Sequence, residues 1–432
     1  MNAYFYTLGC KVNQYETQAM MRLLRSHGYD TAVYHTGMPD VGEAVIVINS
    51  CTVTGESDRK LRQLLRRTRR DNPRAVIAVG GCMPQAFPDI AASFEQADIV
   101  VGNAARNALP ALLDRFFLTR ERVVDIPAHD KAVEPLCIED FEERTRAFVK
   151  IEDGCDRFCS YCIIPFARGR VRSRDPEDIT AELRTLAANG YREVVLVGIN
   201  LTSYGKDNGR SLADAVDAAC AVDGIDRVRL GSLEPDHMTD ELLARLAAQP
   251  NLCPQFHIAL QSGCDTTLKR MNRHYTTAEF EGLCQRLRTA FPDCSLTTDV
   301  MVGFAGETEE DFEQSLAFTQ KMRFSKVHIF PYSRRAGTRA AKFEGQLDNA
   351  TKTDRARRMT DACETVRREI LHETVGTTQR VLAETRTADG KTIGYTEGYL
   401  PCRIDEAVTV GDTVTVKVYK TENDTLFAHI VD

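Results

Sequence analysis

Long apolar runs are missing from this chain of 432 residues. No stretch approaches the roughly 20 consecutive apolar residues that span a bilayer, so we expect neither a transmembrane helix nor a membrane partner. The N-terminus has no basic segment followed by a long apolar run, so no signal peptide is expected. Fourteen cysteines in such a chain favour a reducing compartment, where thiols are metal ligands or core residues rather than disulfides. We therefore expect a soluble, cytoplasmic protein.

An excess of positive charge is also missing, because the formal net charge is −7. Any nucleic-acid partner must then be met by local basic patches. One candidate is a predicted helix over residues 59–70, which is rich in arginine and has almost no acidic residues among them, although a solvated face explains it equally well. The other is the alternation of Arg168, Arg170, Arg172 and Arg174. If that segment is extended, the four side chains point the same way, which favours a strip facing substrate or cofactor.

A fourth cysteine is missing beside the densest cysteine group. Cys155, Cys159 and Cys162 fall within eight positions, a spacing that lets them chelate one metal centre. Thiolates select iron–sulfur clusters or zinc, and a site with three protein ligands keeps one position for chemistry. The alternative is half of a zinc site completed by distant ligands. The three-residue gap before the second cysteine disfavours it, since common zinc knuckles have two.

The first part of the chain, to about residue 120, alternates short apolar runs with helical stretches. Strands are expected over residues 3–8, 31–34, 44–49, 75–80 and 98–101. This alternation predicts a parallel sheet with helices on both faces. Cys10, Cys51 and Cys82 each lie within about two residues of the carboxyl end of a predicted strand, the edge at which open α/β sheets bind ligands. We expect these thiols to converge and favour a second cluster at this edge over the alternative, a packing role for the three cysteines.

A second α/β series follows a linker that is expected over residues 121–146. Its strands are predicted at residues 148–152, 193–197, 228–231, 256–260, 295–302 and 326–330. Repeated units of this length indicate a full or partial barrel, in which reacting groups stand at the carboxyl ends of strands. Cys155 follows the first of these strands, which places the cysteine group on the catalytic face.

The last sixty residues change character. After a helix predicted over residues 352–372, short alternating strands are expected at residues 379–384, 391–397, 399–403, 413–419 and 426–430. They suggest a small closed antiparallel barrel of a kind that often binds RNA. This segment carries more acidic than basic residues, which weakens the case for RNA contact.

Over essentially its whole length the chain resembles the methylthiotransferase family of radical S-adenosylmethionine (SAM) enzymes. The motifs LGCKVNQYET at residues 8–17, NSCTVT at 49–54 and GGCMPQ at 80–85 resemble the family's N-terminal domain. Residues 260–273, 298–308 and 328–333 resemble its radical SAM core. The resemblance implies a cluster-binding domain over 1–120, a linker over 121–146, the core over 147–372 and a TRAM domain over 373–432. Ala305 departs from the family's usual proline but removes no ligand.

The resemblance also implies the cofactors, which are two 4Fe–4S clusters and SAM. One cluster would be held by Cys155, Cys159 and Cys162 and would bind SAM, and the other by Cys10, Cys51 and Cys82. By analogy, the residues lining the SAM site are Tyr161, Gly198, Asn200, Glu234, Gln261 and Asp299. Packing under the loop is the alternative role for Tyr161, and structural capping of barrel strands is the alternative for the others.

Residues 9–16 look like the MtaB-type branch, which acts on N6-threonylcarbamoyladenosine beside the anticodon of tRNA. The implied reaction adds a methylthio group at C2 of that adenine, with SAM as both radical source and methyl donor. The implied partners are a tRNA anticodon loop, an electron donor such as a flavodoxin, and a sulfur source. Three alternatives stay open: isopentenyladenosine in tRNA as substrate, a ribosomal protein as substrate, and a non-catalytic protein that binds zinc and RNA.

Overall fold

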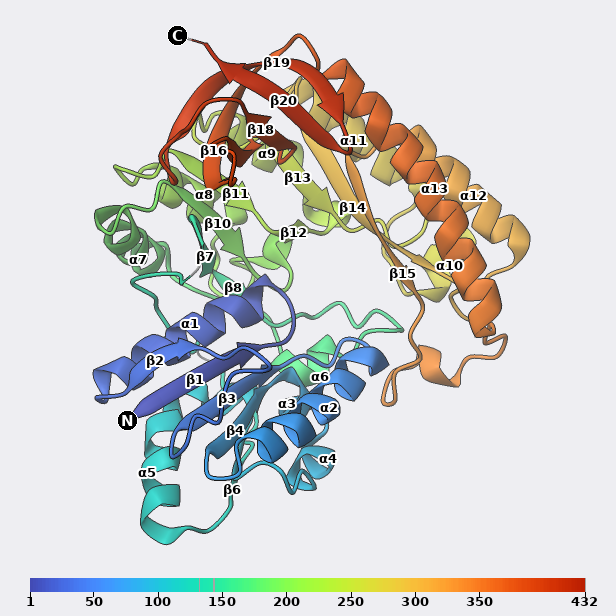
Figure 1. The fold of residues 1–432 in the computed structure, drawn as a ribbon. Coiled ribbons are helices and arrows are strands. Elements are labelled where there is room, and N and C mark those ends of the chain that lie inside the picture. Colours follow the sequence, from blue (N-terminus) through green and yellow to red (C-terminus); the bar gives the residue numbers. More distant parts are fainter. Residues whose placement is uncertain (132, 143, 432) are drawn as a thin grey trace.

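The computed structural model describes residues 1–131, 133–142 and 144–431. A parallel sheet, a central barrel-like sheet and a small closed barrel follow one another along the chain (Figure 1). In the described residues no helix is both long enough and apolar enough to cross a membrane. The predicted fold class is confirmed.

The N-terminal sheet has the strand order β2-β1-β3-β4-β5-β6, and all its pairs are parallel. Its strands are β1 (Asn2–Thr7), β2 (Asp30–Val33), β3 (Val45–Ser50), β4 (Val76–Gly81), β5 (Ile99–Val101) and β6 (Val123–Asp125). Its helices are α1 (Lys11–Ser26), α2 (Gly55–Asp71), α3 (Cys82–Ala86), α4 (Pro88–Ala92), η1 (Asn103–Ala108) and α5 (Leu109–Thr119). Every residue of β3 and β4 is buried, because α1 and α5 cover one face of the sheet and α2 covers the other.

Helix α2 shows how sequence spacing sets this packing. Leu61, Leu64, Leu65 and Thr68 recur every three to four residues and are buried, so they form the stripe that faces the sheet. Thr54 caps the helix by accepting a hydrogen bond from the Ser57 amide at 3.2 Å. The arginines of the predicted basic helix therefore lie on its outer surface.

The segment expected to be a linker has more structure than its sequence indicated. It begins with β6, the edge strand of the N-terminal sheet, which the sequence analysis missed. Further on, Leu136, Ile138 and Phe141 are buried in the main core. The irregular spacing of these apolar residues concealed their burial, because neither strand nor helix periodicity describes them.

The central sheet is a partial barrel of parallel strands arranged in chain order. Its strands are β7 (Arg146–Lys150), β10 (Glu193–Val197), β11 (Arg227–Leu230), β12 (Ser232–Leu233), β13 (Gln255–Ile258), β14 (Ser295–Val302) and β15 (Lys326–Pro331). β11 and β12 are one strand that bends at Gly231 and so divides the barrel into two sheets. A short hairpin of β8 (Glu152–Asp153) and β9 (Arg172–Ser173) follows β7.

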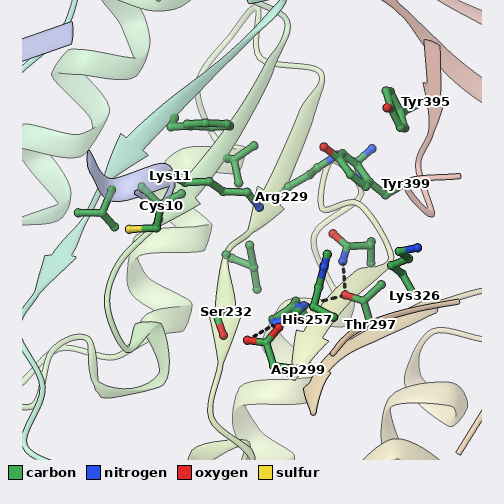
Figure 2. Close-up of a pocket in the computed structure, with 18 of the residues that line it drawn as sticks. Cys10, Lys11, Arg229, Ser232, His257, Thr297, Asp299, Lys326, Tyr395 and Tyr399 are labelled. Atoms are coloured by element: carbon green, nitrogen blue, oxygen red, sulfur yellow. Dashed lines mark hydrogen bonds and ion pairs between the residues drawn. The ribbon is translucent and has the colours of Figure 1, made fainter. Parts of the chain in front are cut away.

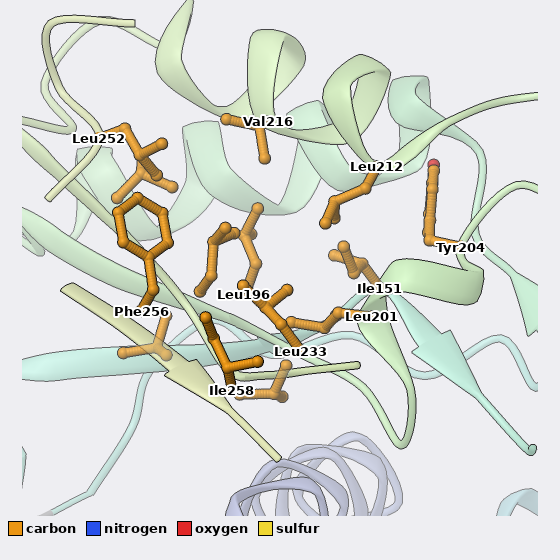
Figure 3. Packing of buried hydrophobic residues seen from close by; sticks show 14 of the residues in the cluster. Ile151, Leu196, Leu201, Tyr204, Leu212, Val216, Leu233, Leu252, Phe256 and Ile258 are labelled. Atoms are coloured by element: carbon orange, nitrogen blue, oxygen red, sulfur yellow. The ribbon is translucent and has the colours of Figure 1, made fainter. Parts of the chain in front are cut away.

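Helices cover the outside of this barrel. They are α7 (Pro176–Ala188), α8 (Leu212–Cys220), α9 (Asp240–Ala247), α10 (Asp265–Arg270), α11 (Thr277–Ala290), α12 (Glu309–Lys321) and α13 (Asn349–Glu373). The segment also forms α6 (Ile164–Arg168), which packs against α3, and the short turns η2 (Leu201–Ser203), η3 (Pro235–His237) and η4 (Ala340–Lys342). Figure 3 shows part of the main core, in which Leu196 and Ile258 of the strands and Leu212 and Val216 of α8 belong to one buried cluster. This packing fixes the strands whose carboxyl ends carry the candidate site.

The C-terminal strands close into a barrel in the order β16-β17-β18-β20-β19. They are β16 (Thr378–Arg386), β17 (Thr392–Thr396), β18 (Pro401–Ile404), β19 (Thr413–Glu422) and β20 (Thr425–Ile430). Four pairings are antiparallel as expected, but β18 and β20 run parallel. The chain crosses the barrel between β18 and β19, so the hairpin of β19 and β20 returns with β20 beside β18 in the same direction.

Candidate active site

The first cysteine group lies at one edge of the N-terminal sheet. Cys51 directly follows β3, Cys82 directly follows β4 and opens α3, and Cys10 lies between β1 and α1. Because β1, β3 and β4 are neighbours and parallel, their carboxyl ends bring the three thiols to the same edge. The predicted placement at strand ends is therefore observed.

Two glycines let the backbones approach at this edge. Gly9 has φ +127°, and a Cβ there would lie 3.0 Å from the Cβ of Cys51. Gly81 has φ +100°, and a Cβ there would lie 2.4 Å from the Ser50 carbonyl oxygen. L-residues rarely adopt such φ values, and neither site has room for a side chain. The glycines before Cys10 and Cys82 thus hold the group together.

Two of these thiols have a raised pKa. Burial raises the pKa of Cys10, and burial together with the neighbouring Cys82 raises the pKa of Cys51 to about 12. Asn13 orients the first thiol, since its Oδ1 accepts a hydrogen bond from Cys10 Sγ at 3.3 Å. Metal binding at this edge would release protons, because thiolates are the ligands.

The second cysteine group lies in the loop between β8 and α6. Cys155, Cys159 and Cys162 share that loop, and Cys162 donates its amide to the Cys159 carbonyl at 3.0 Å. Burial raises the pKa of Cys155 to about 12. Arg273 donates from its guanidinium to Cys159 Sγ at 3.4 Å, which places a positive charge beside one thiol.

Helices α3 and α6 join the two groups. α3 starts at Cys82, α6 starts two residues after Cys162, and the helices pack against each other (Figure 1). Asn103 strengthens the contact by donating to the Ala167 carbonyl at 2.8 Å. In the described part of the chain, no three Cys, His, Asp or Glu side chains surround one point at single-ion distance. The arrangement is two sets of three thiols, one at the edge of the N-terminal sheet and one in the loop between β8 and α6. Thiolates in general are ligands for soft centres.

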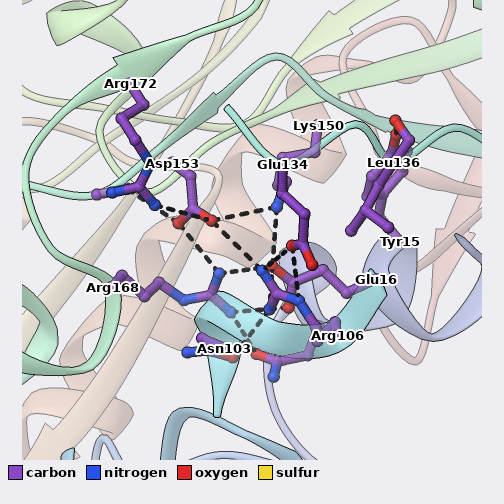
Figure 4. Close-up of polar contacts among 12 residues, drawn as sticks. Tyr15, Glu16, Asn103, Arg106, Glu134, Leu136, Lys150, Asp153, Arg168 and Arg172 are labelled. Atoms are coloured by element: carbon purple, nitrogen blue, oxygen red, sulfur yellow. Dashed lines mark hydrogen bonds and ion pairs between the residues drawn. The ribbon is translucent and has the colours of Figure 1, made fainter. Parts of the chain in front are cut away.

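A buried ion network holds the N-terminal sheet on the barrel (Figure 4). Glu16 of α1 pairs with Arg106 at 2.8 Å, Lys150 at 3.0 Å and Arg168 at 2.7 Å, and all four are almost fully buried. Asp153 pairs with Lys150 and Arg168, both at 3.1 Å. Burial by itself would raise the pKa of Glu16, but Arg106, Arg168 and Lys150 bring it down to about 2.

This network overturns the predicted arginine strip. Arg168 belongs to α6 and is buried against Glu16, while Arg174 is buried against Glu182. Arg172 is also buried, and Arg170 alone is exposed. The alternation failed as a guide because the segment is not one continuous strand: Arg168 lies in α6 and Arg172 in β9, and both face the buried Asp153.

The outer face of α2 keeps part of its predicted charge. Arg59 pairs with Glu56, and Arg69 pairs with Asp98 at 2.5 Å. Arg62 and Arg66 are exposed and have no acidic partner among the residues that the structure describes. These two remain available for a solvent-borne anion.

A cavity of about 810 Å³ extends from the first cysteine group through the barrel interior to the C-terminal barrel (Figure 2). Cys10 and Lys11 line it from the N-terminal sheet, His257 and Asp299 from the central strands, and Tyr399 from the C-terminal barrel. His257 Nε2 lies 3.4 Å from the Asp299 carboxylate. The volume of this cavity lies in the range of small-molecule sites.

Three family models match along the chain. The model described as "Uncharacterized protein family UPF0004" matches residues 2–102, the radical SAM superfamily matches residues 149–319, and the TRAM domain matches residues 372–431. The chain is 36% identical over 442 residues to threonylcarbamoyladenosine tRNA methylthiotransferase MtaB of Bacillus subtilis, covering 99% of this chain and 96% of that protein.

The chain belongs to the radical SAM methylthiotransferase family. Its MtaB relative from Thermotoga maritima is 38% identical, with 91% of this chain and 89% of that protein covered. The tRNA-2-methylthio-N(6)-dimethylallyladenosine synthase of Carboxydothermus hydrogenoformans is 35% identical, with 91% and 90% covered. This chain is therefore an enzyme that transfers a sulfur group, which confirms the family resemblance.

The methylthiotransferase also has the fold of solved radical SAM proteins. The radical SAM methyltransferase TsrM of Kitasatospora setae superposes with a TM-score of 0.55 at 14% identity, covering 78% of this chain and 76% of that one. At this identity the likeness concerns the fold alone.

Two of the predicted SAM residues, Asn200 and Glu234, lie around the second cysteine group of this methylthiotransferase, and a third, Gly198, lines the cavity. Asn200 Nδ2 is 4.0 Å from Cys155 Sγ. Glu234 accepts from Arg273 at 3.1 Å, and that arginine contacts Cys159. Gly198 is packed so closely that a Cβ there would lie 2.5 Å from a Glu152 oxygen.

Of the remaining predicted residues, Tyr161 belongs to the cysteine loop itself, Asp299 lies on β14, and Gln261 follows β13. Asp299 faces the cavity beside His257. Gln261 has φ +64° and extends the pairing of β13 with β14, since its amide donates to the Asp299 carbonyl at 2.8 Å. Tyr161 packs edge-on against Phe304, with 6.3 Å between ring centroids. For Tyr161 the structure shows the packing contact that the sequence analysis gave as its alternative role.

Sequence reasoning missed two side chains at this site. Arg273 stands at the end of a quoted motif, but nothing in the sequence connects it to Cys159 and Glu234 across 114 and 39 positions. Glu152 is fully buried, and burial raises its pKa to about 8, so its carboxyl group is protonated at neutral pH. It follows β7 by two positions, and its position at a strand end was the available signal.

Proposed function

We propose that this enzyme is a tRNA methylthiotransferase that converts N6-threonylcarbamoyladenosine beside the anticodon to its 2-methylthio derivative. The support from relatives is that proteins named for this activity match nearly the whole chain at 34–38% identity. The observation that carries the proposal is the cavity, because Cys10, Asp299 and Tyr399 bring all three parts of the chain to one space.

Cys155, Cys159 and Cys162 would hold a 4Fe–4S cluster, and SAM would bind to it. When bound, that cluster with SAM supplies the radical chemistry needed at an unactivated carbon such as C2 of adenine. Arg273 holds Glu234 and Cys159 in fixed positions through its hydrogen bonds. Asn200 lies close enough to Cys155 to contact a group that is bound by this thiol.

Cys10, Cys51 and Cys82 would hold a second 4Fe–4S cluster that receives the sulfur to be transferred. Cys10 supports this role because it lines the cavity from which the substrate base would be reached. Contact between α3 and α6 keeps the two groups near each other, which suits transfer from one centre to a substrate activated at the other. A flavodoxin-type electron donor and a separate sulfur source complete the proposal, as does a cytoplasmic location.

The RNA would be bound as a loop, because a splayed-out base can enter a pocket. Arg62 and Arg66 on α2 would contact phosphates. The TRAM domain contributes Tyr395 and Tyr399, whose rings stack with centroids 4.8 Å apart next to the cavity.

The test is nucleoside analysis of tRNA after incubation with the reconstituted enzyme, SAM, a reductant and sulfide. A new 2-methylthio derivative of N6-threonylcarbamoyladenosine is the expected product. Cys51→Ala should still cleave SAM but form no such product, with Cys363→Ala, a buried thiol of α13, as the matched control. Unchanged product formation by Cys51→Ala would overturn the two-cluster proposal.

The second candidate substrate is N6-dimethylallyladenosine in tRNA, because a synthase named for its methylthio derivative is 35% identical over 91% of this chain. Offering the enzyme both RNAs in one reaction separates the two. If product formed only on the dimethylallyl RNA, N6-dimethylallyladenosine and not N6-threonylcarbamoyladenosine would be the substrate of this enzyme.

A further inference from the structure

The cavity walls carry an excess of positive charge. Among the described residues that line it are four lysines and arginines and a single carboxylate, Asp299. Those cations are Lys11, Arg229, Lys326 and Arg367. The carboxylate is already engaged, because it lies 3.4 Å from His257. An anionic group would be attracted into this space.

Most of these cations have protein partners that hold them in place. Lys326 pairs with Glu364 at 2.9 Å, and Arg367 donates to the Ser325 carbonyl at 2.8 Å. Arg229 pairs with Glu193 at 2.7 Å and donates to the Thr396 carbonyl at 2.8 Å. Their charges make the electrostatic potential in the cavity more positive, but their N–H groups already donate to these protein partners.

Lys11 is different. No hydrogen bond or ion pair joins its ammonium group to any residue that the structure describes. The side chain extends from the first cysteine group into the cavity toward Arg229 (Figure 2). Its nearest charged neighbours on the barrel, Arg146 and Arg229, are themselves positive and repel it. The Lys11 side chain is exposed and lines the cavity, so its ammonium group is free to contact an anion that enters the cavity.

The local charge balance supports the same conclusion. Three guanidinium groups, those of Arg146, Arg227 and Arg229, share the carboxylate of Glu193. Glu384 adds one further partner, for Arg146. With Lys11, four cations lie around the end of the cavity near Tyr399, and the two carboxylates contact only the three arginines.

We propose that Lys11 binds the carboxylate of a substrate side chain and so selects a nucleoside that carries an acidic substituent over one that carries an apolar substituent. This inference rests on the proposed function, because the threonylcarbamoyl group ends in a carboxylate and the dimethylallyl group does not. The contact is a charge-assisted hydrogen bond from the ammonium group to a carboxylate oxygen. Lys11 acts as a specificity residue and takes no part in the bond-forming step.

The test compares two anticodon stem-loop RNAs, one with N6-threonylcarbamoyladenosine and one with its carboxylate blocked as the methyl ester. Lys11→Met should raise KM for the acid RNA by about 10- to 100-fold, the value of one charge-assisted contact, with little change for the ester RNA. Lys11→Arg should restore most of the loss. Lys321→Met, which removes an exposed lysine of α12, is the matched control.

Two further readouts separate the possible failures. Iron content and SAM cleavage without RNA should be equal in wild type and Lys11→Met; a loss of either would assign Lys11 to the first cysteine group instead. Equal KM values for the acid RNA in both proteins would overturn the proposal for Lys11 while leaving the activity in place. Wild type that modifies neither RNA would overturn the proposed function itself.

Discussion

Replacing Glu16 by glutamine tests the buried network that holds the N-terminal sheet on the barrel. The change keeps the shape of the side chain but removes the charge that pairs with Arg106, Lys150 and Arg168 within 3.0 Å. Breaking a buried pair from one side costs about 3–5 kcal/mol, since the partner charges stay buried. The pKa shift gives a similar figure: a fall from 4.5 to about 2 corresponds to about 3 kcal/mol.

The sign of the pH dependence follows from the lowered pKa. The stabilisation by Glu16 is fully present above its unfolded pKa of 4.5 and is lost as the pH falls toward about 2. Urea unfolding of wild type and Glu16→Gln should therefore differ by about 3 kcal/mol at pH 7 and by progressively less below pH 4.5. Glu56→Gln removes an exposed pair with Arg59 and should leave stability nearly unchanged. A Glu16→Gln difference below 1 kcal/mol at pH 7, or one that does not shrink in acid, would refute the reasoning.

The remaining predictions concern the glycine turn, a protonated carboxyl group and the basic helix. Gly81→Ala should destabilise the protein by more than about 2 kcal/mol and weaken iron binding, because a Cβ there would clash with the Ser50 backbone. Gly28→Ala, with φ +82° but open space around it, should cost only about 1 kcal/mol. Equal shifts of the melting temperature in the two variants would show that the close backbone approach at Gly81 does not matter. Because burial raises the pKa of Glu152 to about 8, the free energy of unfolding should fall as the pH rises from 4.5 to about 8. Glu152→Gln should flatten this pH dependence in urea titrations. The same pH dependence in wild type and variant would contradict a raised pKa for Glu152. Product formation should weaken steeply with salt, and the double change Arg62→Gln and Arg66→Gln should reduce the slope by about one to two; a flat response in wild type would argue against phosphate contacts on α2.

The placement of both cysteine groups was predictable because it depends on strand ends. Apolar runs before Cys51 and Cys82 fix β3 and β4, and parallel pairing then brings their carboxyl ends to one edge. In the central barrel, β10 and β14 begin and end at the predicted residues. Local periodicity placed these two strands, whereas β7, although every residue in it is buried, lies two residues earlier than predicted.

Features that depend on partners distant in sequence were not predictable. The burial of Arg168 depends on Glu16, which lies 152 positions away, so a charge pattern read locally mistook an internal contact for a surface. The parallel pair of β18 and β20 depends on how the chain crosses the barrel. Lys11 was quoted as part of a motif, yet its unpaired position in the cavity follows only from the packing of α1 beside β7.

The central claim is that the chain holds two 4Fe–4S clusters, one in each cysteine group. The most direct measurement is iron and sulfide content, with a visible spectrum, on anaerobically reconstituted wild type and two triple variants. These variants replace by alanine either Cys10, Cys51 and Cys82 or Cys155, Cys159 and Cys162. We predict about eight irons in wild type and about four in each variant. About four irons in wild type, all lost with the second group and none with the first, or zinc in place of iron, would contradict the account.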